Sequence, residues 1–479
     1  MRLHRLWWCL CAGHLLSGPA QAQSQLEPPV SKSAFVQSGP VACPKEADAR
    51  LSTPDFYAVS AADVEGPPGG VIRCWEVPLP GDLGSRYVGY VLMYRTSTLL
   101  HEMGSMRAVT LPATGVAYVP RTPAVAGERP VLVNPHGTTA MARPAAAPLG
   151  CVPSRSRVMD GVMTRLDTEV PDAVLAAPDF TGLGADAGLR VPQSDVPLPT
   201  GTLAFHRIGY PFLSLEGHGR ATIDLVRAVR WLPGAQTGYS PRWAAIGPSA
   251  GGHGAVAAAE VQHKHGYGGE LRLLGVVAGA PTSELTDTSS PTAIRRVIVP
   301  MVLAGLSLEW RDLHPAELLI PQAQEAFATT ANQGCMGSGW EWTQAYSGLP
   351  ADVSVPGAAD LPQVQMALTA NSPGHQPTQV PMLIGLVSGD PVVTRSRTDR
   401  FVARMRGQLS GVAATNPGKV TYCVFNGTPT YYPWEWRVKD HAEVFSKMFG
   451  STTTCTDPSL RPVTMNARTF LRTLFAAPQ

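Results

Sequence analysis

The stretch from Ile246 to Gly254 constrains the fold of this chain more than any other. It reads Ile-Gly-Pro-Ser-Ala-Gly-Gly-His-Gly and lies between two apolar runs, 243–246 and 255–260. The first run predicts a short buried strand and the second a helix. Gly-x-Ser-x-Gly between a strand and a helix is typical of a nucleophile elbow, a tight turn that exposes the serine and needs glycines where backbones pass closely. The alternative is a glycine-rich turn without chemistry.

Segments that predict strands and helices alternate along most of the chain. Strands are expected at 87–96, 108–120, 130–135, 173–178, 243–246, 273–278, 381–387 and 420–425, and helices at 155–168, 217–231, 255–260 and 293–308. We expect the first two strands to be antiparallel. The later alternation favours an α/β fold with a mostly parallel central sheet and helices on both faces.

The order of the predicted strands and helices, together with the N-terminal segment, divides the chain into five parts. We expect a signal peptide at 1–22, an irregular N-terminal arm at 23–85, and the first part of the core at 86–284. Residues 285–379 predict helices but no core strand, so they are interpreted as an inserted helical cap. The second part of the core is expected at 380–479.

The N-terminus predicts export. Arg2, His4 and Arg5 precede a short apolar segment at 6–16, and Ala20-Gln21-Ala22 resembles a cleavage site. The apolar segment is too short to span a bilayer, and no later segment reaches ~20 apolar residues. We therefore expect a secreted or periplasmic protein without a transmembrane segment. Charged residues make up only 15% of the chain and the formal net charge is +2, which argues against a nucleic-acid partner.

Six cysteines remain after removal of the signal peptide: Cys43, Cys74, Cys151, Cys335, Cys423 and Cys455. An even number in an exported protein indicates three disulfides, although the residues alone leave about 15 pairings open and some thiols could be free. No Cys-x-x-Cys spacing occurs. A metal site is therefore not expected.

Ser249 needs a histidine base that a carboxylate orients. In α/β-hydrolases these residues follow in the order Ser, acid, His. Asp390 follows the predicted strand 381–387, and His441 is the histidine beyond it, so we select both. The rejected candidates are Asp399 within a predicted helix, Asp440 as a chain neighbour of the base, and His375, which precedes Asp390.

The oxyanion hole requires two N–H groups preset toward the developing charge. One is expected from Ala250, directly after the nucleophile. The second is expected from the loop after strand 130–135, where His136-Gly137-Thr138 resembles a His-Gly motif. Thr138 is the candidate and Thr139 the alternative. His253 lies too close to the elbow in sequence to act as the base, and we interpret it as structural.

Several motifs together resemble the secretory lipase family, which includes fungal lipases of the lipase A type and bacterial exported esterases. They are His136-Gly137-Thr138-Thr139, Cys151-Val152-Pro153-Ser154, the segment 179–184, Gly209-Tyr210-Pro211-Phe212 with Gly219-Arg220, the segment 247–253, Ala280-Pro281 and the segment 389–393. The resemblance runs from about residue 55 to the C-terminus. It implies an α/β-hydrolase fold with a helical cap, a Ser249/Asp390/His441 triad and no cofactor.

The resemblance also implies a disulfide pattern. It pairs Cys151 with Cys335 and Cys423 with Cys455, which leaves Cys43 to Cys74. Departures from the family concern the elbow, which reads Gly-Pro-Ser-Ala-Gly, and Ala140, where relatives have glycine. These departures leave the triad intact and bear on acyl-chain preference.

The expected function is that of an exported serine carboxyl-ester hydrolase that favours short to medium acyl esters. The same residues could instead cleave amides or peptides, or transfer the acyl group to another alcohol. A third alternative is a hydrolase fold without catalysis that serves in binding.

Overall fold

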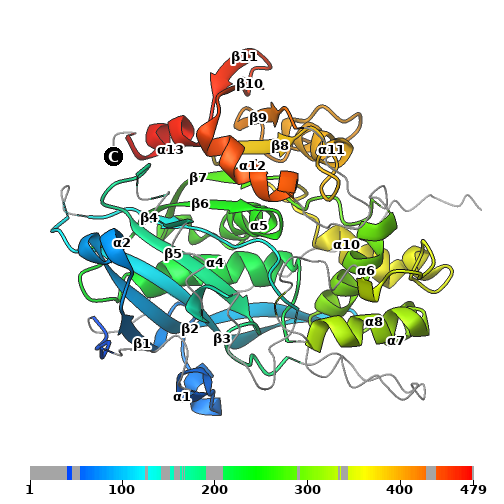
Figure 1. Cartoon of the computed structure of the whole chain (residues 1–479), viewed down its shortest axis with the longest axis horizontal. Coiled ribbons are helices and arrows are strands. Elements are labelled where there is room, and N and C mark those ends of the chain that lie inside the picture. Colours follow the sequence, from blue (N-terminus) through cyan, green and yellow to red (C-terminus); the bar gives the residue numbers. More distant parts are fainter. Residues whose placement is uncertain are drawn as a thin grey trace, which may run out of the picture.

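The computed structural model describes residues 40–45, 54–124, 128–141, 152–155, 162–163, 166, 168–189, 209–287, 292–332, 335, 344–427 and 439–476. The expected signal peptide and most of the helix expected at 155–168 lie outside these residues. One 11-stranded sheet runs through the molecule in the order β1-β2-β3-β5-β4-β6-β7-β8-β9-β10-β11 (Figure 1).

The centre of the sheet is parallel, as the sequence predicted. Its strands are β4 (Val131–Val133), β5 (Val174–Thr181), β6 (Arg242–Pro248), β7 (Arg272–Gly279), β8 (Met382–Val387) and β9 (Val420–Phe425). Neighbouring pairs from β5 to β9 are all parallel. Apolar side chains fill these strands because helices cover both faces of a parallel sheet. Their carboxyl ends therefore share one edge of the sheet.

The N-terminal strands are antiparallel and extend further than predicted. β2 (Tyr87–Glu102) and β3 (Ser105–Pro120) pair over their whole lengths and form a long hairpin. Outside it lies β1 (Val71–Val77), and α2 (Gly81–Arg86) joins β1 to the hairpin. The expectation of an irregular segment up to residue 85 was wrong here, because β1 buries every third residue and lacks the alternation that marks a strand. Short helical turns, α1 (Pro54–Tyr57) and η2 (Ala61–Val64), precede β1.

Helices pack on both faces of the sheet. On one face α4 (Leu215–Val229), α5 (Ala250–Lys264) and α11 (Arg395–Arg406) bury apolar side chains against the strands. On the other face α12 (Lys439–Gly450) and α13 (Ala467–Ala476) do the same. The helix predicted at 217–231 is confirmed, although its polar side is buried as well.

The cap lies between β7 and β8 in the chain and to one side of the sheet (Figure 1). Its helices are α6 (Thr292–Ser307), α7 (Pro315–Leu318), α8 (Pro321–Asn332) and α10 (Pro362–Ala370). Within the described part of this insertion, no strand joins the central sheet. The predicted helix 293–308 is confirmed as α6.

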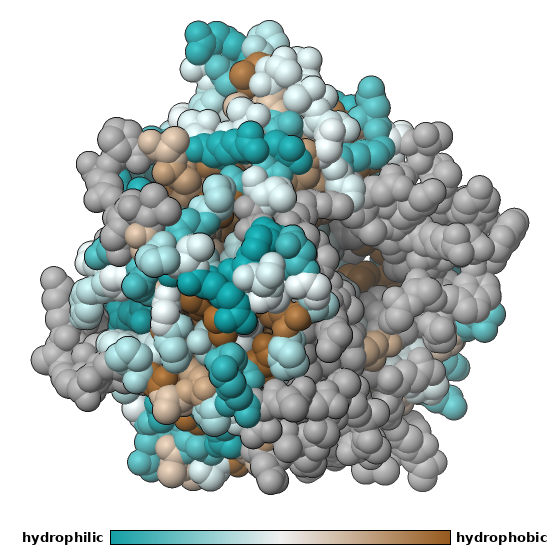
Figure 2. Space-filling view, turned by 60° about the vertical axis from the view of Figure 1, so that its left-hand side comes forward, coloured by the Kyte–Doolittle hydropathy of each residue, from teal (hydrophilic) through white to brown (hydrophobic). Residues whose placement is uncertain are grey.

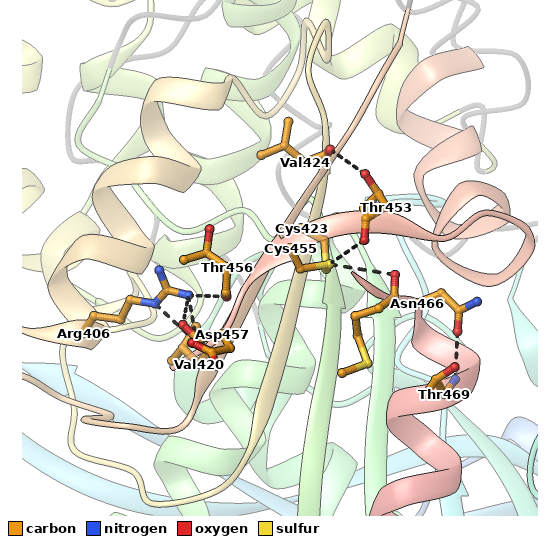
Figure 3. The surroundings of a disulfide bond; sticks show 11 residues. Arg406, Val420, Cys423, Val424, Thr453, Cys455, Thr456, Asp457, Asn466 and Thr469 are labelled. Carbon is orange, nitrogen blue, oxygen red and sulfur yellow. Dashed lines mark hydrogen bonds between the residues drawn. A yellow bond between two sulfur atoms is a disulfide. The ribbon is translucent and has the colours of Figure 1, made fainter. Parts of the chain in front are cut away.

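The C-terminus adds an antiparallel edge that the sequence analysis missed. β10 (Thr453–Thr456) and β11 (Pro462–Met465) continue the sheet beyond β9, and Cys455 lies opposite Cys423. These two cysteines are disulfide-bonded, as predicted, and Figure 3 shows Arg406 beside them donating to the carbonyl oxygens of Val420 and Thr456.

Of the other two predicted disulfides, one is confirmed and the other is described only in part. Cys43–Cys74 is confirmed and holds the N-terminal segment to β1. Cys335 is disulfide-bonded, whereas Cys151 lies outside the described residues. An isolated bridge between Ala140 and Cys335 brings the cap to the loop after β4. Among the helices that the structure describes, none is both long and apolar enough to cross a membrane.

Candidate active site

Ser249 lies on a strained turn between β6 and α5. Its backbone has φ 55° and ψ −123°, a conformation that residues other than glycine rarely adopt. Such a residue costs about 1–3 kcal/mol and persists only where its surroundings enforce it. The Ser249 N–H donates to the carbonyl oxygen of Gly279 at the end of β7 (2.8 Å), and its carbonyl accepts from the N–H of His253 (2.9 Å). The predicted elbow geometry is therefore present.

Two glycines make this turn possible. A Cβ on Gly247 would lie 2.5 Å from the carbonyl of Gly251, and a Cβ on Gly251 would lie 2.1 Å from the carbonyl oxygen of Pro135. Both distances are shorter than any real Cβ contact. The elbow and the loop after β4 therefore touch backbone to backbone, which explains why the sequence has glycine at both positions.

The loop after β4 lies against the nucleophile. A Cβ on Gly137 would come within 3.9 Å of the Ser249 Cβ, and Thr138 follows directly. Ala250 is the first residue of α5, and the first N–H groups of a helix have no partner within it. Among the residues that the structure describes, the buried hydroxyl oxygen of Thr139 has no hydrogen-bond partner. These positions fit the predicted oxyanion hole, whose assignment to Thr138 and Ala250 stays a prediction.

His136 holds the loop in place, a role that the sequence analysis did not assign. Its Nδ1 lies 2.6 Å from the carbonyl oxygen of Gly137, and its Nε2 lies 3.3 Å from that of Asp179. Burial lowers the pKa of His136, so we assign the neutral ring with its proton on Nδ1, the closer contact. The unprotonated Nε2 does not donate to Asp179, so the loop after β4 is linked to β5 by the contact of this ring with Phe180, with ring centroids 5.0 Å apart.

Asp179 is itself fixed by a buried network. Its Oδ1 accepts from the N–H of Ser154 (2.8 Å), and its Oδ2 accepts from the hydroxyls of Ser154 and Thr114. Burial raises the pKa of this carboxyl. No sequence pattern could reveal the pairing, because Ser154, Thr114 and Asp179 belong to separate parts of the chain.

Asp390 occupies the expected loop after β8 and is buried. Its Oδ1 accepts from the N–H groups of Val392 (2.8 Å) and Val393 (3.0 Å), which fix the carboxylate. The rejected Asp399 lies within α11, where its Oδ1 accepts from the Tyr422 hydroxyl (2.7 Å). Asp390 is therefore better suited to orient a base at the carboxyl edge of the sheet.

His441 belongs to the first turn of α12, and its side chain lies outside the described residues. Further along this helix, Val444 and Met448 pack over Gly279. A Cβ on that glycine would lie 3.3 Å from the Val444 side chain and 3.1 Å from the Met448 side chain. Gly279 is the residue that binds the Ser249 N–H. His441 precedes Val444 by three residues, less than one turn and about 5 Å along the axis. The triad itself stays a prediction.

The rejected histidines lie in other surroundings than the expected base. Gly374, next to His375, donates its N–H to Glu260, and Glu260 is 11 residues along α5 from Ser249, roughly 16 Å at the helical rise. His253 is fully buried, and its Nε2 contacts the carbonyl oxygen of Asn371 (3.0 Å). Burial lowers its pKa to about 4, which keeps the ring neutral. The structural interpretation of His253 is confirmed.

An apolar cluster connects the elbow to the cap. Ala250 packs in one buried group with Phe180 and Phe212 from the core and with Val297 and Met301 from α6. In the described part of the chain, no three His, Cys, Asp or Glu side chains gather as a metal-binding group. The arrangement offers a strained serine beside an apolar surface.

Comparison with known proteins agrees with this site. A model of the secretory lipase family matches residues 210–341, which include the elbow and α6. The resemblance to the secretory lipases is confirmed. A search of curated proteins found no match.

Solved structures of lipases and esterases share the fold of this chain. Candida antarctica lipase A in its closed state superposes with a TM-score of 0.55 at 16% identity, covering 89% of this chain and 93% of that one. The rice cell wall degrading esterase LipA from Xanthomonas oryzae gives 0.55 at 17% identity, covering 80% and 98%. At this identity the likeness establishes the α/β-hydrolase fold, which the sequence analysis predicted.

Proposed function

We propose that the protein is an exported serine carboxyl-ester hydrolase that works through an acyl-enzyme. The strained φ of Ser249 at the end of β6 is the observation that supports this most directly. A turn without chemistry gains nothing from a conformation that costs stability, whereas an exposed nucleophile requires it. The predicted signal peptide and the disulfides support export.

In the proposed reaction, Ser249 Oγ attacks the ester carbonyl carbon while His441 accepts its proton. The carbonyl oxygen takes the electron pair and is stabilised by the N–H groups of Ala250 and Thr138. His441 then protonates the leaving alcohol, and Asp390 stabilises the imidazolium. Water attacks the acyl-enzyme by the same steps in reverse and releases the acid and free Ser249.

Variants with matched controls test the triad. Ser249→Ala and His441→Ala should each remove nearly all turnover of p-nitrophenyl butyrate, and Asp390→Asn should lower kcat by about 10⁴-fold. His375→Ala and Asp399→Asn are the controls and should leave kcat unchanged. Full activity in His441→Ala would contradict the assignment. Labelling of the wild type by a fluorophosphonate at Ser249 distinguishes an enzyme from a fold used only for binding.

The buried cluster of Ala250, Phe180 and Met301 supports an apolar acyl group. Each methylene that it buries contributes about 0.8 kcal/mol, so kcat/KM should rise roughly fourfold per methylene until the site is full. We expect good activity on short and medium p-nitrophenyl esters and less on long-chain triglyceride. A maximum on long-chain emulsions would indicate a true lipase. Cleavage of the matched anilides without ester cleavage would favour an amidase, and ester product formed with added alcohol would favour an acyltransferase.

A further inference from the structure

The β2–β3 hairpin extends beyond the catalytic edge of the sheet. β3 pairs with β5 only as far as Ala113, whose partner Thr181 ends β5. The residues from Ser105 to Pro112 therefore continue past the carboxyl edge with β2 as their partner, a length of roughly 26 Å. In Figure 1 both strands run toward the side where the cap helices lie. The tip thus lies on the side from which substrate must approach.

The cap supports the hairpin near its tip. His101 stacks on Trp310 with ring centroids 4.0 Å apart, and the N–H of Arg311 donates to the His101 carbonyl oxygen (2.8 Å). The N–H of Met103 donates to the carboxylate of Asp312 (3.1 Å). Leu100, behind the tip, is buried in the same cluster as the cap helices. These contacts make the tip a firmly held projection.

The turn at the tip exposes methionine where the backbone disfavours it. Glu102 pairs with Ser105, so the turn consists of Met103 (φ 47°) and Gly104 (φ 74°). Asparagine or glycine is the usual residue at the first of these positions, because both central residues need positive φ. The Met103 side chain is nevertheless 88% exposed, and that of Met106 is 53% exposed. The sequence therefore keeps two apolar side chains in water, and one of them, Met103, lies at a strained backbone position.

We propose that this tip, Met103 with Met106, inserts into the surface of aggregated or membrane lipid and holds the enzyme at an interface that carries its ester substrate. The proposal rests on the proposed function. A typical protein–protein interface has roughly 20–30 residues on each partner, far more than these two side chains. A lipid surface, by contrast, accepts shallow insertion of single apolar groups.

The charges around the tip indicate which lipid. The acidic residues Glu102 and Asp312 are matched by the basic residues Arg107 and Arg311. A balanced set favours uncharged or zwitterionic lipid over an anionic membrane, which attracts clusters of basic residues. In the coloured part of the face that Figure 2 shows, hydrophobic residues lie in small groups among hydrophilic ones.

Vesicle binding tests the proposal without catalysis. In a Ser249→Ala background, co-sedimentation with phosphatidylcholine vesicles should weaken at least about tenfold in the double variant Met103→Asn/Met106→Thr. Asparagine tolerates the positive φ, so the hairpin should keep its fold. Met366→Gln on α10 is the control, because Met366 is 58% exposed on the cap. Unchanged binding of the double variant, or an equal loss with Met366→Gln, would overturn the proposal.

Kinetics of the active enzyme separate this proposal from the proposed function. With tributyrin emulsion the double variant should show an increase in apparent KM of about tenfold, whereas kcat/KM for dissolved p-nitrophenyl butyrate should not change. Equal loss on both substrates would indicate damage to the site and overturn lipid anchoring. A change of oligomeric state in the double variant would assign the tip to a protein contact instead. A wild type that hydrolyses neither substrate would contradict the proposed function.

Discussion

Replacing Gly251 by alanine should separate the elbow from the oxyanion loop without unfolding the protein. The new methyl group would lie 2.1 Å from the carbonyl oxygen of Pro135 and 2.8 Å from the His136 backbone. Real Cβ atoms do not come closer than 3.0 Å, so α5 and the loop must separate by at least the 0.9 Å between these values. His136 donates to Gly137 within this loop and packs on Phe180 of β5. The displacement therefore reaches the N–H groups of Thr138 and Ala250 that we propose for the oxyanion hole.

A displacement of that size should lower kcat for p-nitrophenyl butyrate by about 10²-fold, the effect of misplacing a reacting group by 1 Å or of losing one oxyanion donor. KM should change little, since the clash involves the backbone of Pro135 and His136 and no side chain of the apolar cluster. Alanine gains about 1 kcal/mol of helix propensity, which offsets part of an overpacking cost of about 1–3 kcal/mol. The variant should therefore remain folded by circular dichroism and thermal melting.

Gly254→Ala is the matched control in the same helix. Its Cβ would lie 3.3 Å from the Cζ of Phe180 and 3.3 Å from the Cβ of Pro135. Both are side-chain atoms that can shift slightly. We expect kcat within a few fold of the wild type. The reasoning would be refuted if folded Gly251→Ala retained wild-type kcat, because close backbone approach would then not set the oxyanion geometry.

Two further predictions concern stability. Burial raises the pKa of Glu260 from 4.5 to about 8, so its carboxyl is neutral in the folded state and the free energy of unfolding should fall as pH rises between these values, by up to about 5 kcal/mol. Glu260→Gln should remove that dependence in urea denaturation, and equal pH slopes for the two proteins would contradict it. Non-reducing peptide mapping should join Cys151 to Cys335, a tether worth roughly 4–5 kcal/mol across so long a loop; a free thiol at either residue would exclude it.

The sequence alone was sufficient to predict those features that residues close together in the chain determine. The elbow could be predicted because Gly247, Ser249 and Gly251 carry the turn within five residues, and the predicted strand 420–425 has the bounds of β9. Strand and helix alternation likewise predicted the parallel sheet and the cap. These features depend on spacing that neighbouring residues reveal.

The features that were missed depend on contacts between distant segments. The hairpin was expected to end at Thr96 and resume at Ala108, because Met103-Gly104 is not a usual turn pair and the polar residues beside it do not alternate. β10 is threonine-rich, and its pairing with β9 on one side and β11 on the other shows only in three dimensions. The role of His136 depends on the ring of Phe180, which belongs to a different strand.

The insertion of the cap between two neighbouring strands has a consequence for folding during synthesis. β7 ends at Gly279, but its partner β8 begins only at Met382. Until that point of the nascent chain is available, the apolar edge of β7 has no strand beside it, and open edges of this kind pair with other chains. Pairing across so long a stretch is also intrinsically slow. Substitutions that delay the cap should therefore lower the yield of native protein through aggregation, even where the molecules that do fold have full activity.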